Sequence, residues 1–309
     1  MGSSREMRVR IKSIKNIAQV TKALETVSAS KVRKAIQVYS STKTYSEKAW
    51  EVLVHLAEQT TGEKLHPLLS DNNEIDNILV VMITSDRGLS GAYNMNIVRN
   101  TLQYFKDFPN QIQYLTIGKK GRDFLRRRRK QLIAEFSNIP SPPSFLDISP
   151  IGRIAVDGFL SGEFDEVYVS FTEFVNKVRQ DPVVYKLLPL DIQAIEGRKT
   201  GKTNEAILER NRNNHPKAVF TYEPEPGELL SEIVPRFISI QIYQAILSAQ
   251  ASEHAARMIA MGNATDNAKE LMSILQMEYN KIRQQAITND MLDIVGGVEA
   301  MAHPVRMAK

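Results

Sequence analysis

The 309-residue chain has no cysteine. The absence of thiols excludes disulfide bonds, thiolate metal sites and thiol-based redox switches. Long apolar runs are also missing, since none approaches the roughly 18 residues that a membrane-spanning helix needs. The opening segment, MGSSREMRVRIKSIK, lacks the apolar core of a secretory signal peptide. We therefore expect a cytosolic protein, or one that reaches a membrane through other chains.

Two long stretches lack proline and nearly lack glycine. Residues 3–61 contain neither, and residues 236–303 contain only Gly262, Gly296 and Gly297. Because these two residue types are the usual helix breakers, the stretches predict helices of roughly 50 and 60 residues. At 1.5 Å per residue the second would be on the order of 90 Å long, so most of it cannot be buried in one globular domain.

Apolar or small residues recur at three- and four-residue steps along both stretches. Such heptad-like stripes are typical of helices that pair. We predict an antiparallel coiled coil made from the two ends of the chain. A pair of ordinary bundle helices is the alternative, but helices in globular proteins average only about 11 residues.

Between these stretches the pattern changes to short apolar runs that alternate with helical ones. Strands are predicted at 77–84, 112–117, 131–136, 166–174 and 183–190, with helices at 96–108, 119–130 and 148–160. This alternation is typical of a parallel α/β sheet. The predicted fold is thus a long antiparallel coiled coil with an inserted Rossmann-like α/β domain. Its segments are 1–62 (N-terminal helix), 63–224 (α/β domain, with an exposed loop at about 195–217) and 225–309 (C-terminal helix and tail).

Positive charge is concentrated at the start of the chain. The net charge is +5, and residues 1–50 carry eleven Lys or Arg against three Glu. A solvated helix face explains this bias equally well as a face that meets an acidic protein or nucleic acid.

Two glycine-containing segments suggest ligand sites but fit them poorly. GRKTGKT at 197–203 has three residues between its glycines, where a phosphate-binding loop needs four, so an exposed basic loop is favoured. RGLSGAYN at 87–94 follows a strand and precedes a helix, where α/β proteins bind ligands. It has neither the dinucleotide-binding spacing nor the serine environment of a nucleophile elbow. We expect Gly88 and Gly91 to supply the freedom for a tight turn.

No catalytic, metal or cofactor site is predicted. The five histidines are scattered, without an HExxH pair or carboxylates at ligand spacing. His254 lies on the apolar stripe, where we expect it to pack or to face a partner. No combination of nucleophile, base and oxyanion donors is recognisable.

Five segments, in this order and spanning nearly the whole chain, resemble the gamma subunit of F-type ATP synthase. They are IKSIKNIAQVTKALETVSASKVRKA, ITSDRGLSGAYN, YEPEPGELL, LSAQASEHAARMIAMGNATDNAKELM and YNKIRQQAITNDMLDIVGG. The resemblance implies a rotor shaft that enters a ring of three alpha and three beta subunits. Its α/β foot would lie near the epsilon subunit and the membrane c-ring. It implies no nucleotide, cofactor or catalytic residue in this chain, no nucleic acid, and membrane contact only through the c-ring.

The resemblance also implies contact residues. They are Arg283, Gln284 and Thr288 for a catch loop on beta; Lys22 and Leu24 for the acidic lever of beta; Met291, Leu292, Ile294 and Val295 for an apolar sleeve; and Thr42, Tyr45, Tyr222 and Glu223 for the c-ring side. The expected location is peripheral, on the cytoplasmic face of a bacterial plasma membrane or the equivalent thylakoid face.

The chain departs from the family pattern in two places. The segment 191–216 is longer than in short relatives and lacks the cysteine pair of the chloroplast redox switch, and the tail after Gly297 runs past the usual end. Two other functions stay open from the residues alone: a stand-alone α/β nucleotide-binding enzyme with coiled-coil arms, and a basic coiled-coil scaffold for nucleic acid. ATP binding by the isolated chain would favour the first, and strongly salt-dependent DNA binding the second.

Overall fold

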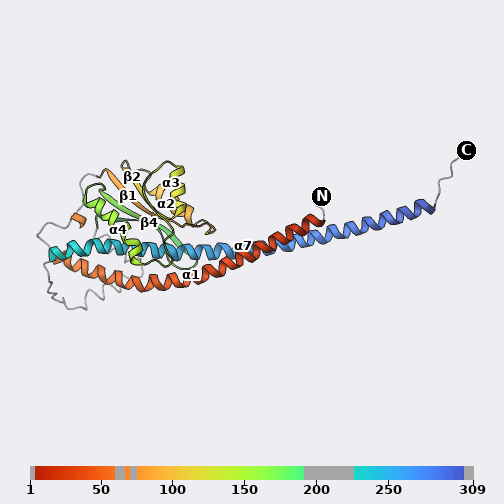
Figure 1. Ribbon diagram of the computed structural model, residues 1–309, viewed down its shortest axis with the longest axis horizontal. Coiled ribbons are helices and arrows are strands. Elements are labelled where there is room, and N and C mark those ends of the chain that lie inside the picture. Colours follow the sequence, from red (N-terminus) through yellow and green to blue (C-terminus); the bar gives the residue numbers. More distant parts are fainter. Residues whose placement is uncertain (1–3, 60–66, 70–74, 191–225, 303–309) are drawn as a thin grey trace. The chain divides into compact units, whose positions relative to one another are not determined.

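The computed structural model describes residues 4–59, 67–69, 75–190 and 226–302 (Figure 1). The chain forms two compact units. The first joins Met1–Val27 to Met258–Lys309, and the second consists of Ser28–Arg257. The predicted loop at 195–217, the GRKTGKT segment, Tyr222, Glu223 and the end of the tail lie outside the described residues.

Two long helices run through both units. Helix α1 spans Ser4–Gln59, and α7 spans Pro226–Ala302. Helix α7 begins upstream of the proline-free stretch and continues through Pro235, although proline removes one backbone N–H donor from the helix.

The two helices pair in opposite directions within each unit. In the first unit, Thr265 donates to the Thr21 hydroxyl over 2.8 Å and Arg8 donates to the Tyr279 hydroxyl over 2.7 Å. In the second, Trp50 packs on Phe237, with ring centroids 5.4 Å apart, and Gln241 donates to Ser46. Because rising positions on α7 meet falling positions on α1, the predicted antiparallel coiled coil is confirmed.

The second unit contains a five-stranded sheet in the order β3-β2-β1-β4-β5. The strands are β1 (Asn77–Ile83), β2 (Gln111–Ile117), β3 (Gln131–Phe136), β4 (Glu166–Phe174) and β5 (Gln180–Leu188). The first four are parallel, as predicted, but β5 pairs antiparallel with β4. A five-residue turn separates β4 from β5, which is too short for the crossover that a parallel neighbour needs.

Helices cover both faces of the sheet. The intervening helices are α2 (Tyr93–Tyr104), α3 (Lys119–Arg127) and α4 (Phe145–Leu160), and η1 (Pro67–Leu69) is a short 3₁₀ turn. Side chains alternate along β1: Ile78, Val80 and Met82 pack with α2 and α3, whereas Leu79, Val81 and Ile83 pack with α4 and α7. This alternation places α7 on one face of the sheet as part of the core, together with α4 (Figure 1).

Candidate functional site

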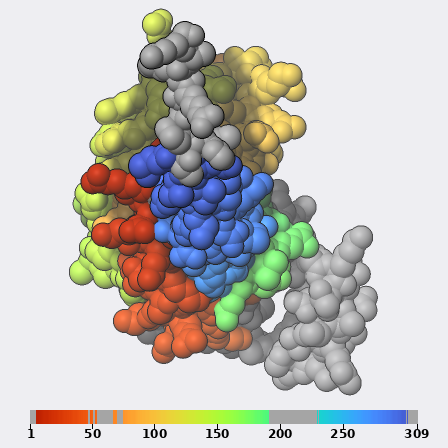
Figure 2. Space-filling view, turned by 90° about the vertical axis from the view of Figure 1, so that its right-hand side faces the viewer, coloured from red at the N-terminus to blue at the C-terminus, as the bar shows by residue number. Residues whose placement is uncertain are grey.

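The C-terminal stretch of α7 exposes an apolar stripe that the rest of the described chain does not cover. Every described side chain from Arg283 to Glu299 is exposed. Apolar side chains recur there at heptad spacing, with 51–78% exposure, at Ile287, Met291, Ile294, Val298 and Met301. Figure 2 shows the C-terminal part of α7, in blue, from the side on which it faces the viewer. Contiguous exposed apolar surface of this kind is typical of a binding face.

The four residues predicted for an apolar sleeve lie on this stretch. Met291 and Leu292 are each 63% exposed, Ile294 is 67% exposed and Val295 is 60% exposed. Within about the two preceding turns are the three polar residues predicted to contact a catch loop, Arg283, Gln284 and Thr288, which are all exposed. The Thr288 hydroxyl donates to the backbone carbonyl of Gln284 over 3.0 Å. Among the described residues, the side chains of Arg283 and Gln284 make no hydrogen bond, so both can bind another chain.

The predicted contact residues of α1 are placed less uniformly. Lys22 is exposed and pairs with Glu25 over 3.1 Å, whereas Leu24 is half-buried. Thr42 is half-buried with its hydroxyl donating to the Val38 carbonyl, and Tyr45 is 56% exposed. Lys22 and Tyr45 are therefore the α1 positions most available to a partner.

The sheet has the topological switch point at which doubly wound α/β proteins bind ligands. The chain order reverses between β1 and β4, so the crevice is expected at the carboxyl ends of these two strands. Here α7 occupies that position. Ser248 accepts from the Phe174 amide over 2.9 Å, Ser252 donates to the Thr172 carbonyl over 3.1 Å, and Tyr93 donates to the Ala249 carbonyl over 3.1 Å.

The helix N-terminus beside this edge is also occupied from within the chain. The Asp86 carboxylate accepts from the Lys119 amide at the start of α3, over 3.2 Å, and from the Asn138 amide, over 2.8 Å. The Thr84 hydroxyl accepts from the Gly121 amide over 2.9 Å. A phosphate at a helix N-terminus uses these same amides, and it would meet a carboxylate here. This arrangement disfavours the nucleotide-binding alternative.

Glycine use in the loop after β1 differs from the prediction in one respect. Gly91 has a φ of 59°, as a tight turn requires, but the second left-handed residue is Leu89, with a φ of 64°. A Cβ at Gly88 would meet only the Lys120 side chain, at 3.9 Å, so the predicted need for glycine at that position is wrong. The Gly88 carbonyl is instead an acceptor for α7.

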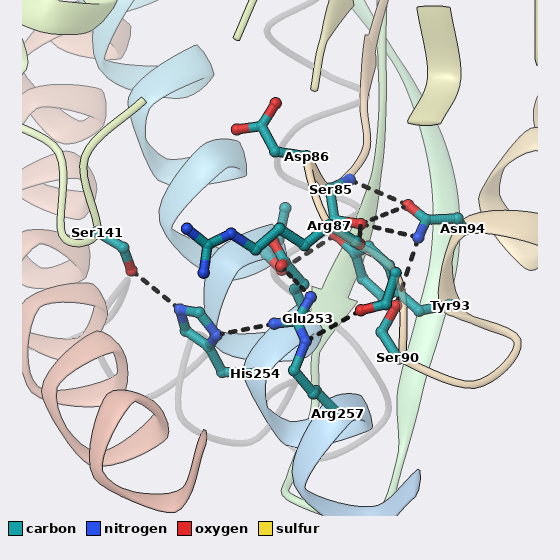
Figure 3. Close-up of polar contacts among 12 residues, drawn as sticks. Ser85, Asp86, Arg87, Ser90, Tyr93, Asn94, Ser141, Glu253, His254 and Arg257 are labelled. Carbon is teal, nitrogen blue, oxygen red and sulfur yellow. Dashed lines mark hydrogen bonds and ion pairs between the residues drawn. The ribbon is translucent and has the colours of Figure 1, made fainter. Parts of the chain in front are cut away.

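Arg257 joins α7 to this loop. Its Nε donates to the Gly88 carbonyl over 3.2 Å, its Nη2 to Glu253 over 2.6 Å, and its Nη1 to His254 Nδ1 over 3.3 Å (Figure 3). On its other side, His254 Nε2 lies 3.0 Å from the Ser141 hydroxyl. Because a guanidinium only donates, Nδ1 must accept, and the neutral ring donates from Nε2 to Ser141.

Burial and charge shift the pKa values of both acidic and basic groups in this cluster. Burial raises the pKa of Glu253 above its usual range, although Arg257 opposes the change. Burial, with the positive charges of Arg257 and Lys31, lowers the pKa of His254 to about 4. His254 is 5% exposed, so the expectation that it packs is confirmed. The sequence offered one signal for this cluster: polar Ser248, Ser252 and His254 within an apolar stripe.

Neither a metal site nor a membrane span is present in the part of the chain that the structure describes. No group of three or more His, Asp or Glu side chains there is arranged to hold a metal ion. None of the described helices combines the length and apolar character needed to cross a bilayer.

Comparison with known proteins gives a consistent result. A family model described as ATP synthase matches residues 3–301. The ATP synthase gamma chain of Dehalococcoides mccartyi (strain CBDB1) is 42% identical over 303 residues, covering 98% of this chain and 100% of the relative. That of Roseiflexus castenholzii is 40% identical over 305 residues, covering 98% and 99%.

Two solved structures from Euglena gracilis mitochondrial ATP synthase share the fold. The rotor in rotational state 1 aligns with a TM-score of 0.63 at 19% identity, covering 92% of this chain and 98% of the other. A chain of the OSCP/F1/c-ring structure in rotational state 3 aligns with a TM-score of 0.65 at 18% identity, covering 99% and 98%. Near-complete coverage at about 40% identity extends along both long helices and the sheet. The chain therefore belongs to the ATP synthase gamma chain family.

Proposed function

We propose that this chain is the central-stalk rotor subunit of a proton-translocating F-type ATP synthase, carrying torque between a membrane c-ring and a catalytic ring of alpha and beta subunits. The observation that carries the proposal is the exposed heptad stripe from Ile287 to Met301 on α7. An apolar helix face that the described part of the chain leaves uncovered fits the inside of an apolar sleeve. Membership of the gamma chain family supports the same role.

The mechanism requires a shaft that is stiff and uneven around its circumference. Two paired helices resist bending and twisting better than one. An uneven surface makes different contacts with each of three surrounding catalytic subunits, and only differential contact free energy can shift their conformations. The surface of α7 meets this requirement, because exposed apolar residues alternate with Arg283, Asp290, Asp293 and Glu299.

In this assembly each predicted contact residue has a proposed partner. Arg283, Gln284 and Thr288 would donate to a catch loop on beta, and Lys22 with Leu24 would face the acidic lever of beta. Met291, Leu292, Ile294 and Val295 would turn inside the sleeve, and Thr42, Tyr45, Tyr222 and Glu223 would lie on the c-ring side. An epsilon subunit would complete the foot.

The chain would carry no catalytic residue or cofactor of its own and would contact the membrane only through the c-ring. Its location would be peripheral, on the cytoplasmic face of a bacterial plasma membrane or the equivalent thylakoid face. Residues 1–62 and 225–309 would act as the shaft, and residues 63–224 as the foot.

Co-expression with the alpha and beta subunits of the same synthase tests the proposal. We expect one copy of this chain to purify with three of each, and the complex to hydrolyse ATP. The chain alone should neither bind nor hydrolyse ATP. Binding of ATP by the isolated chain, with no assembly, would instead favour the stand-alone enzyme.

Variants of the exposed stretch test its contacts. Ile294→Asp places a charge in the sleeve and should weaken assembly, because an unpaired buried charge costs several kcal/mol. Arg283→Ala or Gln284→Ala should leave assembly intact and lower ATP turnover by the complex. Glu278→Gln, at an exposed position of the same helix, is the matched control. Turnover equal to the control in both variants would remove these residues from the catch contact.

A further inference from the structure

Within the unit Ser28–Arg257, hydrogen bonds from the end of β4 and from two loops hold α7 on two sides. Ser248 and Ser252 bond to the end of β4, at the Phe174 amide and the Thr172 carbonyl. Gln250 donates to the Pro140 carbonyl over 2.9 Å, and Arg257 donates to the Gly88 carbonyl over 3.2 Å. At about 100° per residue, Ser252 lies about 40° around the helix from Ser248, whereas Gln250 and Arg257 lie about 180–200° away. The bonds therefore form two rows on nearly opposite sides of the helix.

The geometry resists rotation of α7 about its own axis. A rotation of about 20° would move a polar atom that lies about 5 Å from the axis by about 1.7 Å. Hydrogen bonds weaken steeply when they lengthen or bend by this much. Apolar burial is non-directional and roughly proportional to the area removed from water, so it depends less steeply on the angle of the helix than these bonds do. The two rows therefore define the rotational position of the helix more sharply than the surrounding core does.

The loop that binds Arg257 is itself anchored to the sheet by hydrogen bonds. All three nitrogens of the guanidinium have acceptors, and the side chain is only 11% exposed. The loop that provides the Gly88 carbonyl is itself held, because the Ser85 hydroxyl donates to the Arg87 carbonyl over 2.5 Å and the Asn94 side chain accepts from the Ser85 amide over 3.0 Å (Figure 3). These hydrogen bonds, linked through the backbone between Arg87 and Gly88, thus join α7 to the end of β1 and the start of α2.

We propose that Ser248, Ser252 and Arg257 form a torsional lock, a set of positioning residues that prevents α7 from turning about its axis within the α/β body. The lock uses the edge at which other doubly wound proteins bind nucleotides. The inference rests on the proposed function in one respect: in a rotor, the lock would pass torque applied to the α/β body directly into α7.

The first test uses the full-length chain alone and does not depend on the rotor role. Because the chain has no cysteine, spin labels can be placed at Leu146→Cys on α4 (81% exposed) and Glu232→Cys on α7 (exposed). We expect Arg257→Met to broaden the label-to-label distance distribution measured by electron–electron double resonance. The matched control is Arg236→Met, the same substitution at an exposed position of α7. Arg257→Lys, which keeps the charge without the planar fork, should broaden it less.

A second variant keeps the test decisive if Arg257→Met does not fold. Ser248→Ala with Ser252→Ala removes the opposite row, with a smaller change in volume and no loss of charge. Equal widths in wild type, the control and every folded lock variant would overturn the proposal. A lower melting temperature without broadening would do the same, because it would show a purely structural role.

The second test uses the complex with alpha and beta subunits. A bead attached at Leu146→Cys reports the angular fluctuations of the α/β body while the catalytic ring is held on a surface. Losing one of two rows of directional bonds should increase the variance of the angle about twofold, with unloaded ATP turnover retained. If the distance distribution broadens in the free chain but the angular variance of the complex does not change, the lock does not carry torque into α7. A wild-type complex that fails to rotate would instead refute the proposed function, while the spin labels still report on the lock.

Discussion

The buried histidine of α7 gives a quantitative prediction about pH. His254 is 5% exposed, and its ring is neutral because Nδ1 accepts from Arg257 while Nε2 donates to Ser141. Burial is the largest cause of its lowered pKa, followed by the positive charges of Arg257 and Lys31. Protonation in the folded state would place a second positive charge against the guanidinium and remove the Nδ1 acceptor. We therefore predict that His254 makes the free energy of unfolding depend on pH.

The sign follows from the two pKa values. The folded value is about 4 and the ordinary value is 6.5, so between these pH values the unfolded chain binds the proton and the folded chain does not. The free energy of unfolding must then fall as the pH falls from 6.5 to 4. At 1.36 kcal/mol per pH unit, the loss at pH 5.5 relative to pH 7.5 is about 1.3 kcal/mol, and the limit below pH 4 is about 3 kcal/mol.

Glu253 acts in the opposite direction in the same cluster. Its pKa is raised, so the folded chain takes up the carboxyl proton first and is stabilised as the pH falls through the folded pKa toward 4.5. Asp86 and Lys31 also influence this carboxyl. The wild-type profile alone therefore mixes two effects. Comparison with His254→Gln isolates the histidine, because both proteins retain Glu253.

Urea unfolding followed by the fluorescence of Trp50, the only tryptophan, measures the effect in the unit that contains His254. Between pH 7.5 and 5.5 the wild type should lose about 1.3 kcal/mol more than His254→Gln. Ser141→Ala is the control, since it removes the acceptor of Nε2 without removing the titrating ring, and it should keep most of the pH dependence. Equal losses in wild type and His254→Gln would refute the neutral buried ring.

Three further predictions use the same unfolding assay. Gly152→Ala should cost about 1–3 kcal/mol, because its Cβ would lie 2.4 Å from the Ser239 hydroxyl, and Ser239→Ala should recover part of the loss; strict additivity would contradict this contact. Phe237→Ala should cost about 3–5 kcal/mol, because the ring is 1% exposed at the junction of the two long helices; a loss below 1 kcal/mol, on the order of a surface substitution, would contradict that burial. Thr101→Val should lower the free energy of unfolding by about 1–3 kcal/mol, because the buried Ser170 hydroxyl, 2.5 Å away, loses this partner. Adding Ser170→Ala should restore much of the lost stability. No recovery in the double variant would show that the loss has another cause.

The elements that the sequence predicted well are those set by local rules. The freedom of residues 3–61 from helix breakers and the continuous apolar run of β1 are visible in the residues themselves, and both elements lie where they were predicted. The antiparallel direction of β5 was not predicted, because it depends on the length of the connection from β4 rather than on the composition of the strand. Similarly, Pro235 does not end α7, because the buried faces of Val234 and Phe237 hold the helix on both sides of it.

The sites divide in the same way. The exposed stripe near Ile294 was predictable, because a heptad pattern records apolar positions whether or not a partner is present. The hydrogen bonds that hold α7 were not predictable. Ser248 and Ser252 bond to backbone groups of β4, and every residue type carries the same backbone groups. The role of Gly88 was misread for this reason: its carbonyl, not its freedom of φ, is what α7 uses.

Stability alone does not explain why α7 carries polar groups where it is most deeply buried. Each neutral hydrogen bond contributes only about 1 kcal/mol net, and a buried ion pair such as Glu253–Arg257 is often no more stabilising than apolar side chains of the same size. An all-apolar α7 of matched volume could pack against the same sheet with similar free energy, but apolar burial would set its angle less sharply than directional bonds do. Directional bonds on two sides define this angle, since each is satisfied at only one rotation of the helix. The polar groups therefore define the rotational position of α7 about its axis. A helix that transmits rotation needs this position to be fixed more than other helices do.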